Sequence, residues 1–527
     1  MNKVNLILHA HLPYVRHLEY ERFLEEDWLY ESLNESYLPL LRILRKLDEE
    51  KVNFKLTMCF SPTLLTMLTD GPLQERFVAY MERHIELGEK EVERTKTEDT
   101  ECNVLAQRYL DDTKANLALY EELERNILPA FKHLENVGRI ELIASAATHA
   151  FLPLYKEYPE AINAQIAEGI KTHKRIFGVT PRGFWLPECG YYDGLDKLLK
   201  KNGVDWIQLP SQSVITAQDK SLYGGYRPII LPSGVHGFAR DWNLTNLVWS
   251  DKYGYPCDGD YREFYRDIGY YLPMEYVGPY MHEPSLRVFT GYKYYAITGK
   301  TENKHFYNLE RAEEKVQLHV DNFLYNIRKK GQLIDAAGIP DHLSNLTFDA
   351  ELFGHRWYEG LSFLEKLLRS LSEDSTRYKM VTPSEEIDEN GRMEELRINE
   401  CSWGQRGGAD TWLDASNAWI YRHTTKAIER MVELTERFPD QGSLKERFLN
   451  QASRELLLSM ASDWPCIMHD NTSTSYAEKR LRNHIGSFNV VHSSMCRNTV
   501  NTEWLIHAER CNAIFPDIDF RVFERKA

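Results

Sequence analysis

The sequence predicts an α/β protein: a parallel (β/α)7 barrel with an inserted subdomain and a C-terminal all-helical domain. Three observations predict this class: seven short β-rich runs, helical patterns between most of them, and only helical patterns after about residue 411. Strands that alternate with helices indicate parallel pairing with crossover helices, and a closed barrel leaves no strand edge unpaired. The expected strands span residues 4–9, 54–60, 140–146, 183–187, 204–209, 346–349 and 379–382.

The segments between and after these strands divide the chain into three parts. Helical patterns of the barrel span residues 30–50, 73–134, 159–177, 194–202, 308–337 and 360–372. A Tyr-, Gly- and Pro-rich stretch interrupts them and predicts an inserted, lid-like subdomain over 211–284. The barrel then takes residues 1–210 and 285–400, and the helical domain takes 401–527, with helices expected at 412–437, 443–462, 476–490 and 499–513.

The composition excludes several classes of function. With 64 Lys and Arg against 79 Asp and Glu, the net charge is −15, which disfavours nucleic acids and anionic membranes as partners. Eight scattered cysteines without a CxxC pair are typical of a reducing compartment, and no segment approaches ~18 consecutive apolar residues. We therefore expect a soluble, cytoplasmic protein that does not enter a membrane.

Two histidines follow the first expected strand as His9-Ala10-His11. Positions i and i+2 of a strand face the same side, so both imidazoles point toward one space at the barrel mouth. With His149 and Asp349 they could complete a divalent metal site. Alternatively, they donate hydrogen bonds to a polar ligand, or serve a structural role.

A carboxylate ends the strand at residues 183–187, in the motif Gly183-Phe184-Trp185-Leu186-Pro187-Glu188. A carboxylate beside Trp and Pro at a barrel mouth lies in a partly dry environment, where its pKa and reactivity are altered. This makes Glu188 a candidate nucleophile or acid/base. The alternative is an ordinary acidic residue before the helix expected at 194–202.

A second carboxylate, Asp349, ends the strand at residues 346–349, and Glu351 follows two positions later. Glycoside cleavage requires two carboxylates across the scissile bond, ~5–5.5 Å apart in retaining enzymes and ~6.5–9.5 Å apart in inverting ones. Glu188 and Asp349 come from different strands of one barrel face and suit this role. Glu351 is the rival acid, or it binds the substrate or orients His355.

Two tryptophan motifs come late in the chain. Trp403, flanked by glycine in Ser402-Trp403-Gly404 with Trp412 beyond it, predicts either an exposed stacking platform or a seal between barrel and helices. Asp463, between Ser462 and Trp464, could bind sugar hydroxyls or cap a helix. The sequence contains no GxxxxGK[ST], GxGxxG before a helix, HExxH or GxSxG motif, which disfavours phosphate, dinucleotide and serine-hydrolase chemistry.

Together these motifs resemble glycoside hydrolase family 57, including its α-1,4-glucan branching enzymes and related α-amylases. The likeness extends over nearly the whole chain, from residues 9–15 through 147–153, 185–191, 348–355 and 402–404 to 462–464. It implies a (β/α)7 barrel, Glu188 as nucleophile and Asp349 as general acid/base, with no metal and no other cofactor. It also implies that His9 and His11 line the donor sugar subsite, and that Arg240, Cys257, Trp403 and Asp463 contact substrate.

The resemblance indicates an α-1,4-glucan, such as amylose or a glycogen-like polysaccharide, as the partner of this protein. The expected activity is branching, with α-amylase or 4-α-glucanotransferase activity as the alternative on the same site. Members of the family carry Gly where this chain has Cys257, whose side chain could crowd a backbone contact. Branching requires aromatic faces that hold an acceptor and exclude water, for which the candidates are Trp28, Tyr223, Trp249, Trp403 and Trp412. From another class, a metal-dependent deacetylase-like hydrolase using His9, His11 and Asp349 stays open.

Overall fold

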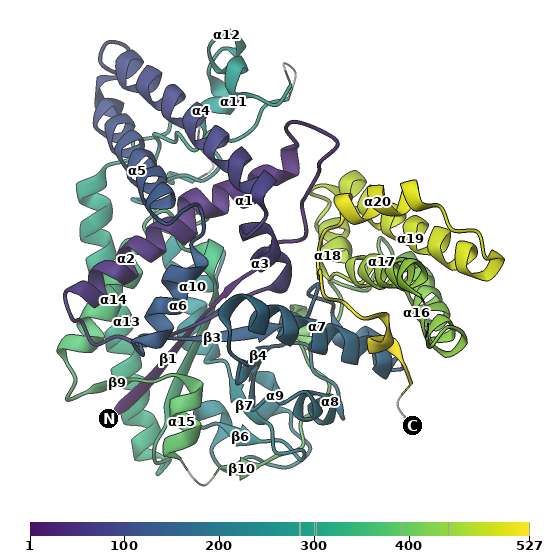
Figure 1. The fold of residues 1–527 in the computed structure, drawn as a ribbon. Helices are drawn as coiled ribbons and strands as arrows, with labels where there is room; N and C mark the ends of the chain where they lie inside the picture. Colours follow the sequence, from purple (N-terminus) through teal and green to yellow (C-terminus); the bar gives the residue numbers. More distant parts are fainter. Residues whose placement is uncertain (284–285, 300, 302, 391–392, 441, 526–527) are drawn as a thin grey trace.

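The computed structural model describes residues 1–283, 286–299, 301, 303–390, 393–440 and 442–525. Its centre is a curled sheet of mostly parallel strands surrounded by helices, and a separate group of C-terminal helices packs beside it (Figure 1). The α/β class and the helical C-terminal region expected from the sequence are thus confirmed.

Seven parallel strands form the curl, in the order β7-β5-β4-β3-β2-β1-β8. Beyond β7, the short strand β6 (Ile229–Ile230) pairs antiparallel, and β10 (Glu394–Glu395) extends that edge. At the seam, the backbone N–H of Asp241, just after β7, donates to the carbonyl of Asn345 in β8 at 2.7 Å, so the two ends of the curl meet. The seven strands are β1 (Asn2–Ala10), β2 (Leu56–Phe60), β3 (Ile140–Ser145), β4 (Gly183–Trp185), β5 (Trp206–Leu209), β7 (His236–Ala239) and β8 (Leu343–Asp349).

One strand expected from the sequence lies elsewhere, and another was missed. The segment expected at 379–382 forms β9 (Tyr378–Met380), which pairs with Asn2–Val4 of β1 and does not extend the ring. Its expected place in the ring is taken by β7, inside the stretch expected to be the insertion. A Cβ on Gly237 would lie 2.5 Å from the Leu209 side chain, so close packing against β5 requires glycine in this strand.

Two strands of the sheet lie within the stretch expected to be the insertion. Residues 229–239 carry β6 and β7, so the sheet of the barrel continues past residue 210. Short helical turns and loops make up much of the following stretch. The boundary expected at residues 284 and 285 lies outside the described residues.

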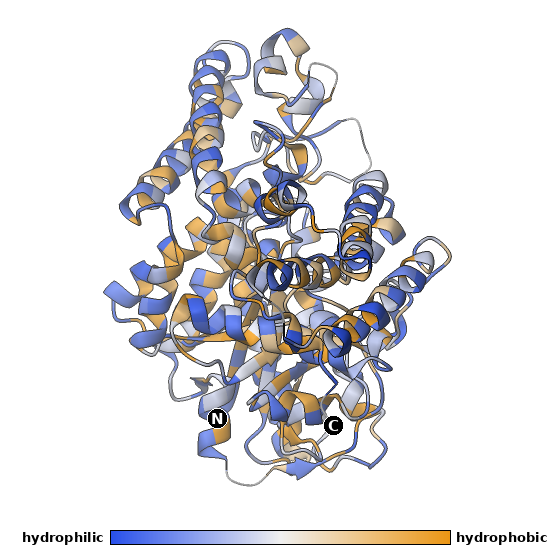
Figure 2. Ribbon diagram, turned by 45° about the vertical axis from the view of Figure 1, so that its right-hand side comes forward, coloured by the Kyte–Doolittle hydropathy of each residue, from blue (hydrophilic) through white to orange (hydrophobic). Residues whose placement is uncertain are grey.

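Helices cover the sheet with their hydrophobic faces turned toward the centre of the molecule and their hydrophilic faces outward (Figure 2). Several begin at side-chain caps: Ser61 accepts from Leu64 before α3, Asp70 from Leu73 before α4, and Asn308 from Arg311 before α13. The long stretch expected at 73–134 is three helices, α4, α5 and α6. The helices before residue 400 are α1 (Asp27–Ser32), α2 (Leu38–Glu49), α3 (Pro62–Leu68), α4 (Gly71–Thr95), α5 (Asn103–Glu122), α6 (Leu128–Asn136), α7 (Pro159–Phe177), α8 (Leu195–Lys201), α9 (Gln212–Ile215), α10 (Trp242–Trp249), α11 (Ile268–Tyr271), α12 (Met274–Val277), α13 (Leu309–Ala336), α14 (Gly360–Glu373) and α15 (Pro383–Glu389).

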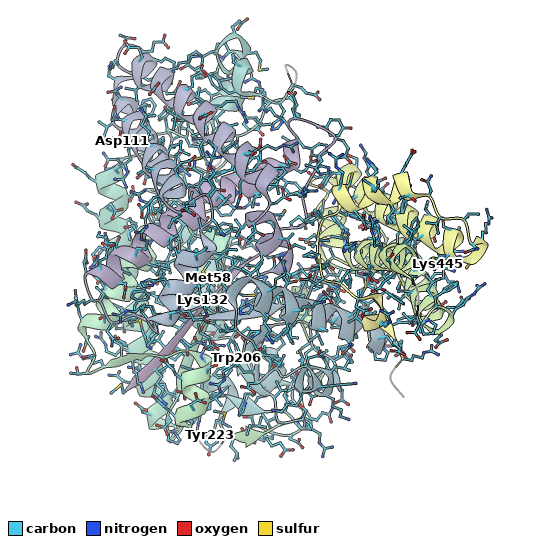
Figure 3. All side chains as sticks on the ribbon, in the orientation of Figure 1. Met58, Asp111, Lys132, Trp206, Tyr223 and Lys445 are labelled. Atoms are coloured by element: carbon cyan, nitrogen blue, oxygen red, sulfur yellow. The ribbon has the colours of Figure 1, made fainter. Side chains whose placement is uncertain are left out.

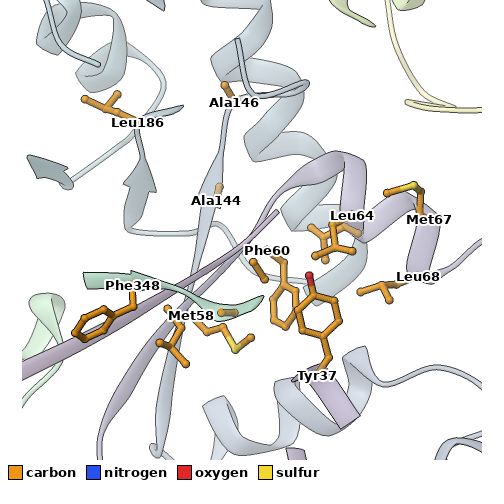
Figure 4. Close-up of a cluster of buried hydrophobic side chains, with 14 of the residues drawn as sticks. Tyr37, Met58, Phe60, Leu64, Met67, Leu68, Ala144, Ala146, Leu186 and Phe348 are labelled. Carbon is orange, nitrogen blue, oxygen red and sulfur yellow. The ribbon is translucent and has the colours of Figure 1, made fainter. Parts of the chain in front are cut away.

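The barrel core lies between these helices and the strands. All five residues of β2 are buried, as is typical of parallel strands covered on both faces. Figure 4 shows Met58 and Phe60 of β2 beside Leu64 of α3 and the ring of Tyr37. Tyr37 comes from a π-helical segment, Leu33–Tyr37, that joins α1 to α2, and its hydroxyl reaches the barrel mouth from this core.

The C-terminal helices are α16 (Trp419–Arg437), α17 (Ser443–Ser459), α18 (Asp463–Asp470), α19 (Thr474–Arg497) and α20 (Thr502–Cys511). This region contacts the barrel loops through hydrogen bonds to backbone carbonyls: the N–H of Ser462 donates to the carbonyl of His149 at 3.0 Å, and the Arg480 guanidinium donates to the carbonyl of Tyr14 at 3.0 Å. The start of α18 is thereby held at the barrel mouth. Within the described part of the chain, no helix has the length and apolar character needed to cross a membrane.

Candidate active site

Parallel strands carry the candidate residues to one end of the barrel. The register of β1 and β8 places His9 beside Asp349. β4 ends at Trp185, three residues before Glu188, and β3 ends at Ser145, four residues before His149. Because these strands run in the same direction, their carboxyl ends open on one face, where barrel enzymes place their chemistry.

Two residues of this face have left-handed backbone conformations. Glu188 has φ 58° and His149 has φ 57°, although neither is glycine. Such conformations cost on the order of 1–3 kcal/mol and persist where neighbouring contacts hold them. For Glu188 such a contact comes from the backbone N–H of Trp403, which donates to its carbonyl at 3.0 Å.

The Glu188 carboxylate is held by donors from distant parts of the chain. The indole N–H of Trp403 donates to Oε2 at 2.8 Å, and the Ser462 hydroxyl donates to Oε1 at 3.0 Å. His149 Nδ1 lies 3.7 Å from Oε1. Burial raises the pKa of Glu188, while the bonds from Trp403 and Ser462 oppose that rise by stabilising the ionised form. The carboxylate is therefore fixed in one orientation with its charge supported.

The histidines form a stack beside this carboxylate. The rings of His11 and His149 are 3.8 Å apart between centroids, and the ring of His9 lies 4.4 Å from that of Trp185. His9 Nε2 and His149 Nε2 share a hydrogen bond at 2.9 Å. Burial, together with the neighbouring His11, lowers the pKa of both His9 and His149 well below its ordinary value. Both rings are therefore neutral at physiological pH.

His11 differs from its neighbours because it faces an acid. Its Nε2 lies 3.0 Å from Oδ1 of Asp463, the first residue of α18, and its Nδ1 bonds the Ser61 hydroxyl at 2.8 Å. Burial alone lowers the pKa of His11, but Asp463 reverses this and gives a net rise. The site thus has one imidazole that favours the charged form, and it is paired with the C-terminal helical region.

The carboxyls that end β8 favour protonation. Burial raises the pKa of Asp349 well above its ordinary value, and the nearby carboxylates of Glu351 and Glu188 raise it further. Burial also raises the pKa of Glu351, to about 7, although Glu351 accepts bonds from the Tyr37 hydroxyl and from the His11 backbone N–H at 3.1 Å. The donors on Glu188 oppose the rise of its pKa, whereas neighbouring carboxylates add to the rise at Asp349. Two carboxyls in such different environments suit nucleophile and acid roles.

A cavity of about 370 Å³ opens over Asp349. Its wall brings together six residues singled out in the sequence: His11, Trp28, Trp249, Asp349, Glu351 and His355. The Trp249 indole N–H donates to the Thr347 carbonyl at 3.2 Å, which fixes its ring edge-on to Trp403. Partly buried tryptophan faces beside carboxyls are suited to sugar rings.

The guanidinium of Arg240 also lies at this face. It packs over Trp403, 6.0 Å from the ring centre, and over Trp242 at 5.3 Å. Asp349 is close enough to act on the pKa of Arg240, which burial lowers. Trp242 is 53% exposed and was not singled out in the sequence, because the helical pattern of α10 offers no reason to prefer it.

Nine of the fifteen candidate residues do not line this cavity. Six of these nine make the contacts described above, namely His9, His149, Glu188, Arg240, Trp403 and Asp463, whereas Trp412, Cys257 and Tyr223 lie elsewhere. The ring of Trp412 is 3% exposed and stacks on Phe151 with centroids 4.4 Å apart, which fits the alternative of a seal between barrel and helices. Cys257 is exposed, and its Sγ bonds the Ser250 carbonyl at 3.5 Å. Tyr223 lies under the Arg227 guanidinium, close to β6 and β10 (Figure 3). Ser221, two residues before it, bonds Glu394 of β10 at 2.7 Å.

Sequence reasoning also missed two polar partners of the site. Ser462 was noticed only as a neighbour of Asp463, yet its hydroxyl contacts Glu188 directly. Tyr37 lies inside an apparently ordinary helix, and nothing in the sequence signals that its hydroxyl reaches Glu351. Both contacts depend on packing between distant elements.

The geometry does not favour a metal site of the kind considered from the sequence. Across the described residues, no three His, Cys, Asp or Glu side chains are arranged to hold a metal ion. Nε2 of His11 is paired with Asp463, which lies outside the set of His9, His11, His149 and Asp349 considered for a metal.

Comparison with known proteins identifies the family of the chain. Residues 5–399 match the model of glycosyl hydrolase family 57. The chain belongs to glycoside hydrolase family 57. Residues 423–523 of this family member match a second model, described as 1,4-alpha-glucan branching enzyme, C-terminal. That match includes Ser462 and Asp463, which contact Glu188 and His11.

Two solved structures and one further relative resemble the chain over 94% or more of its length. The crystal structure of the α-amylase AmyC from Thermotoga maritima is 41% identical with a TM-score of 0.93, covering 100% of this chain and 99% of the other. The branching enzyme from Pyrococcus horikoshii is 30% identical with a TM-score of 0.87, covering 100% and 97%. The 1,4-alpha-glucan branching enzyme TK1436 of Thermococcus kodakarensis is 29% identical over 94% of this chain and 74% of that protein.

Proposed function

We propose that the protein is a 1,4-α-glucan branching enzyme, which cleaves an α-1,4 linkage and transfers the glucan segment to a 6-hydroxyl. The observation that carries this proposal is the contribution of the C-terminal region to the catalytic face. That region matches the C-terminal model of branching enzymes, and its Ser462 donates to Glu188 while its Asp463 pairs with His11. α-Amylase activity is the alternative, favoured by the 41% identity to AmyC.

The mechanism we propose is retaining and proceeds in two steps. Glu188 attacks the anomeric carbon while Asp349 donates its proton to the departing glycosidic oxygen, which yields a glucosyl ester on Glu188. Asp349, now ionised, then removes the proton of the incoming hydroxyl, which displaces the ester and restores the α configuration. The high pKa of Asp349 supports the acid role, and the donors on Glu188 support the nucleophile role.

The acceptor decides between transfer and hydrolysis. Water in the second step gives a new reducing end, whereas a glucan 6-hydroxyl gives an α-1,6 branch. The tryptophans of the cavity wall, Trp28 and Trp249, provide faces on which an acceptor chain can displace water. We also propose a glycogen-like polymer as the product, and a cytoplasmic location, supported by eight cysteines that are all free thiols.

Incubation with amylose tests the proposal. We expect new chain ends, released as short chains by a debranching enzyme, without a matching rise in reducing ends. Reducing ends that appear alone and in step with cleavage would identify an amylase and reject branching. The α-1,6 anomeric proton signal in the NMR spectrum gives an independent measure of branch formation.

The pair Trp403 and Trp412 gives a matched test of the support for Glu188. Trp403→Phe removes the indole N–H that donates to Glu188, and we expect kcat to fall about 10- to 100-fold, the effect of losing one hydrogen bond to a charged group. Trp412→Phe removes an indole N–H that has no hydrogen-bond partner among the described residues, and we expect kcat within about twofold of the parent. Equal losses in the two variants would contradict the role of Trp403, with circular dichroism and thermal unfolding as checks of the fold.

A further inference from the structure

A second cavity, of about 550 Å³, lies outside the candidate active site. Residues of α2, α5, α13 and α14, which lie on one side of the barrel in Figure 1, contribute to its wall together with Arg262. Its volume falls within the range of small-molecule sites, ~300–1,000 Å³. The catalytic scheme above makes no use of it.

A buried cation dominates the wall of this second cavity. Arg262 is only 7% exposed, and its guanidinium lies over the ring of Tyr358, 4.0 Å from the centroid, and 5.5 Å from that of Tyr109. In the described part of the chain it forms no ion pair with a carboxylate, while its backbone N–H donates to Glu359 at 2.9 Å. A buried guanidinium on aromatic faces is poised to donate hydrogen bonds to a ligand.

The charge of the wall selects a neutral ligand. Acidic side chains outnumber basic ones by five to four. The basic groups Arg108 and Lys46 are committed, the first to Asp112 at 2.6 Å and the second to Glu365 at 3.0 Å. An anion such as phosphate would meet this net negative wall, whereas a sugar offers hydroxyl acceptors to Arg262 and C–H faces to the tyrosine rings.

The second cavity adjoins the candidate active site at the pair Glu35 and His355. Glu35 lines the second cavity, His355 lines the first, and His355 Nδ1 lies 2.6 Å from Glu35 Oε2. A ligand in the second cavity therefore lies close to Asp349 and Glu351, which line the first cavity together with His355.

From these observations we infer that the second cavity is a glucan-binding site, in which Arg262 and Tyr358 hold glucosyl units of a chain that also reaches the active site. The identity of the ligand as an α-glucan rests on the proposed function. Binding at two neighbouring sites raises the effective concentration of a long chain at the catalytic carboxyls. The second site therefore increases the affinity for long glucans, which can occupy both sites, more than the affinity for short ones.

Calorimetric titration of maltotriose tests this inference, using Glu188→Gln so that the ligand is not consumed. We expect two binding sites in Glu188→Gln and one after Arg262→Met is added, or a Kd at the second site raised about tenfold or more. In the otherwise unmodified enzyme, Arg262→Met should raise KM for amylose by a similar factor and leave kcat within about twofold. Arg328→Met is the matched control, because Arg328 lies over Tyr325 at 5.7 Å on α13 and lines neither cavity, and it should leave both sites intact.

Tyr358→Ala changes a half-buried ring and serves as a second variant, should Arg262→Met fail to fold. A single site in Glu188→Gln, or two sites that neither variant alters, would overturn the inference. Inorganic phosphate that binds in an Arg262-dependent way where maltotriose does not would overturn it as well. The amylose assay on the parent enzyme separates the two proposals: inactivity there, with an Arg262-dependent maltotriose site present, rejects branching and leaves the second site standing.

Discussion

Glu188→Gln is expected to lower kcat on amylose by about 10⁴- to 10⁶-fold and to leave the fold intact, because an amide cannot form the glucosyl ester. The substitution preserves the shape of the side chain. The amide oxygen still accepts from the indole N–H of Trp403, and the amide N–H₂ can donate to the hydroxyl of Ser462. Single-turnover measurement of reducing ends and branch points, with maltotriose affinity as a check of binding, reports the loss.

The barrel offers a close control for this variant at the opposite end of its strands. Glu141, near the start of β3, accepts from the Trp206 indole N–H at 3.0 Å and from the Ser384 hydroxyl, the same pair of donor types that hold Glu188. Glu141→Gln should leave kcat within about twofold. Residual activity of Glu188→Gln above about 1% of the parent would assign the nucleophile to another group, with Glu351 the first to examine.

The sequence predicts the catalytic face well where one local pattern sets the position of a side chain. Glu188 and Asp349 each follow a short apolar strand, and the carboxyl ends of parallel strands must lie together. The spacing of His9 and His11 likewise predicts that they share a face. These residues needed no knowledge of packing between distant segments.

Contacts between distant segments could not be predicted in the same way. Ser462 reaches Glu188 across 274 positions because the start of α18 docks on the barrel mouth. Trp403 and Trp412 lie in similar glycine-rich surroundings, yet one ring binds Glu188 and the other is sealed against Phe151. Burial of this kind follows from tertiary packing, which a local pattern does not encode.

The strand β7 shows the same limit for the fold. Its four residues, His236–Ala239, are too few to display an alternating pattern, and the surrounding Tyr, Gly and Pro favour a loop interpretation. Its strand conformation follows from parallel pairing with β5. The sequence therefore predicts seven strands in the ring but places the segment 379–382 there instead of β7.

Asp349→Asn is expected to lower kcat on amylose by about 10²- to 10⁴-fold, the contribution of a general acid and base. The loss should be far smaller in the first step with an α-maltotriosyl fluoride donor, because fluoride departs without a proton. The glucosyl ester on Glu188 should then accumulate, since no base activates the acceptor. Mass spectrometry of the intact protein detects that ester as an added maltotriosyl unit.

Two further measurements separate Asp349 from its rival Glu351. Azide needs no base, so it should restore turnover of Asp349→Asn. Its attack on the β-linked ester gives an α-glucosyl azide, which has the configuration of the starting glucan. The parent should lose kcat/KM as pH rises through the raised pKa of Asp349, because the acid must be protonated, and this alkaline limb should vanish in Asp349→Asn. An alkaline limb that persists in Asp349→Asn but vanishes in Glu351→Gln would assign the proton to Glu351, whose pKa burial raises to about 7.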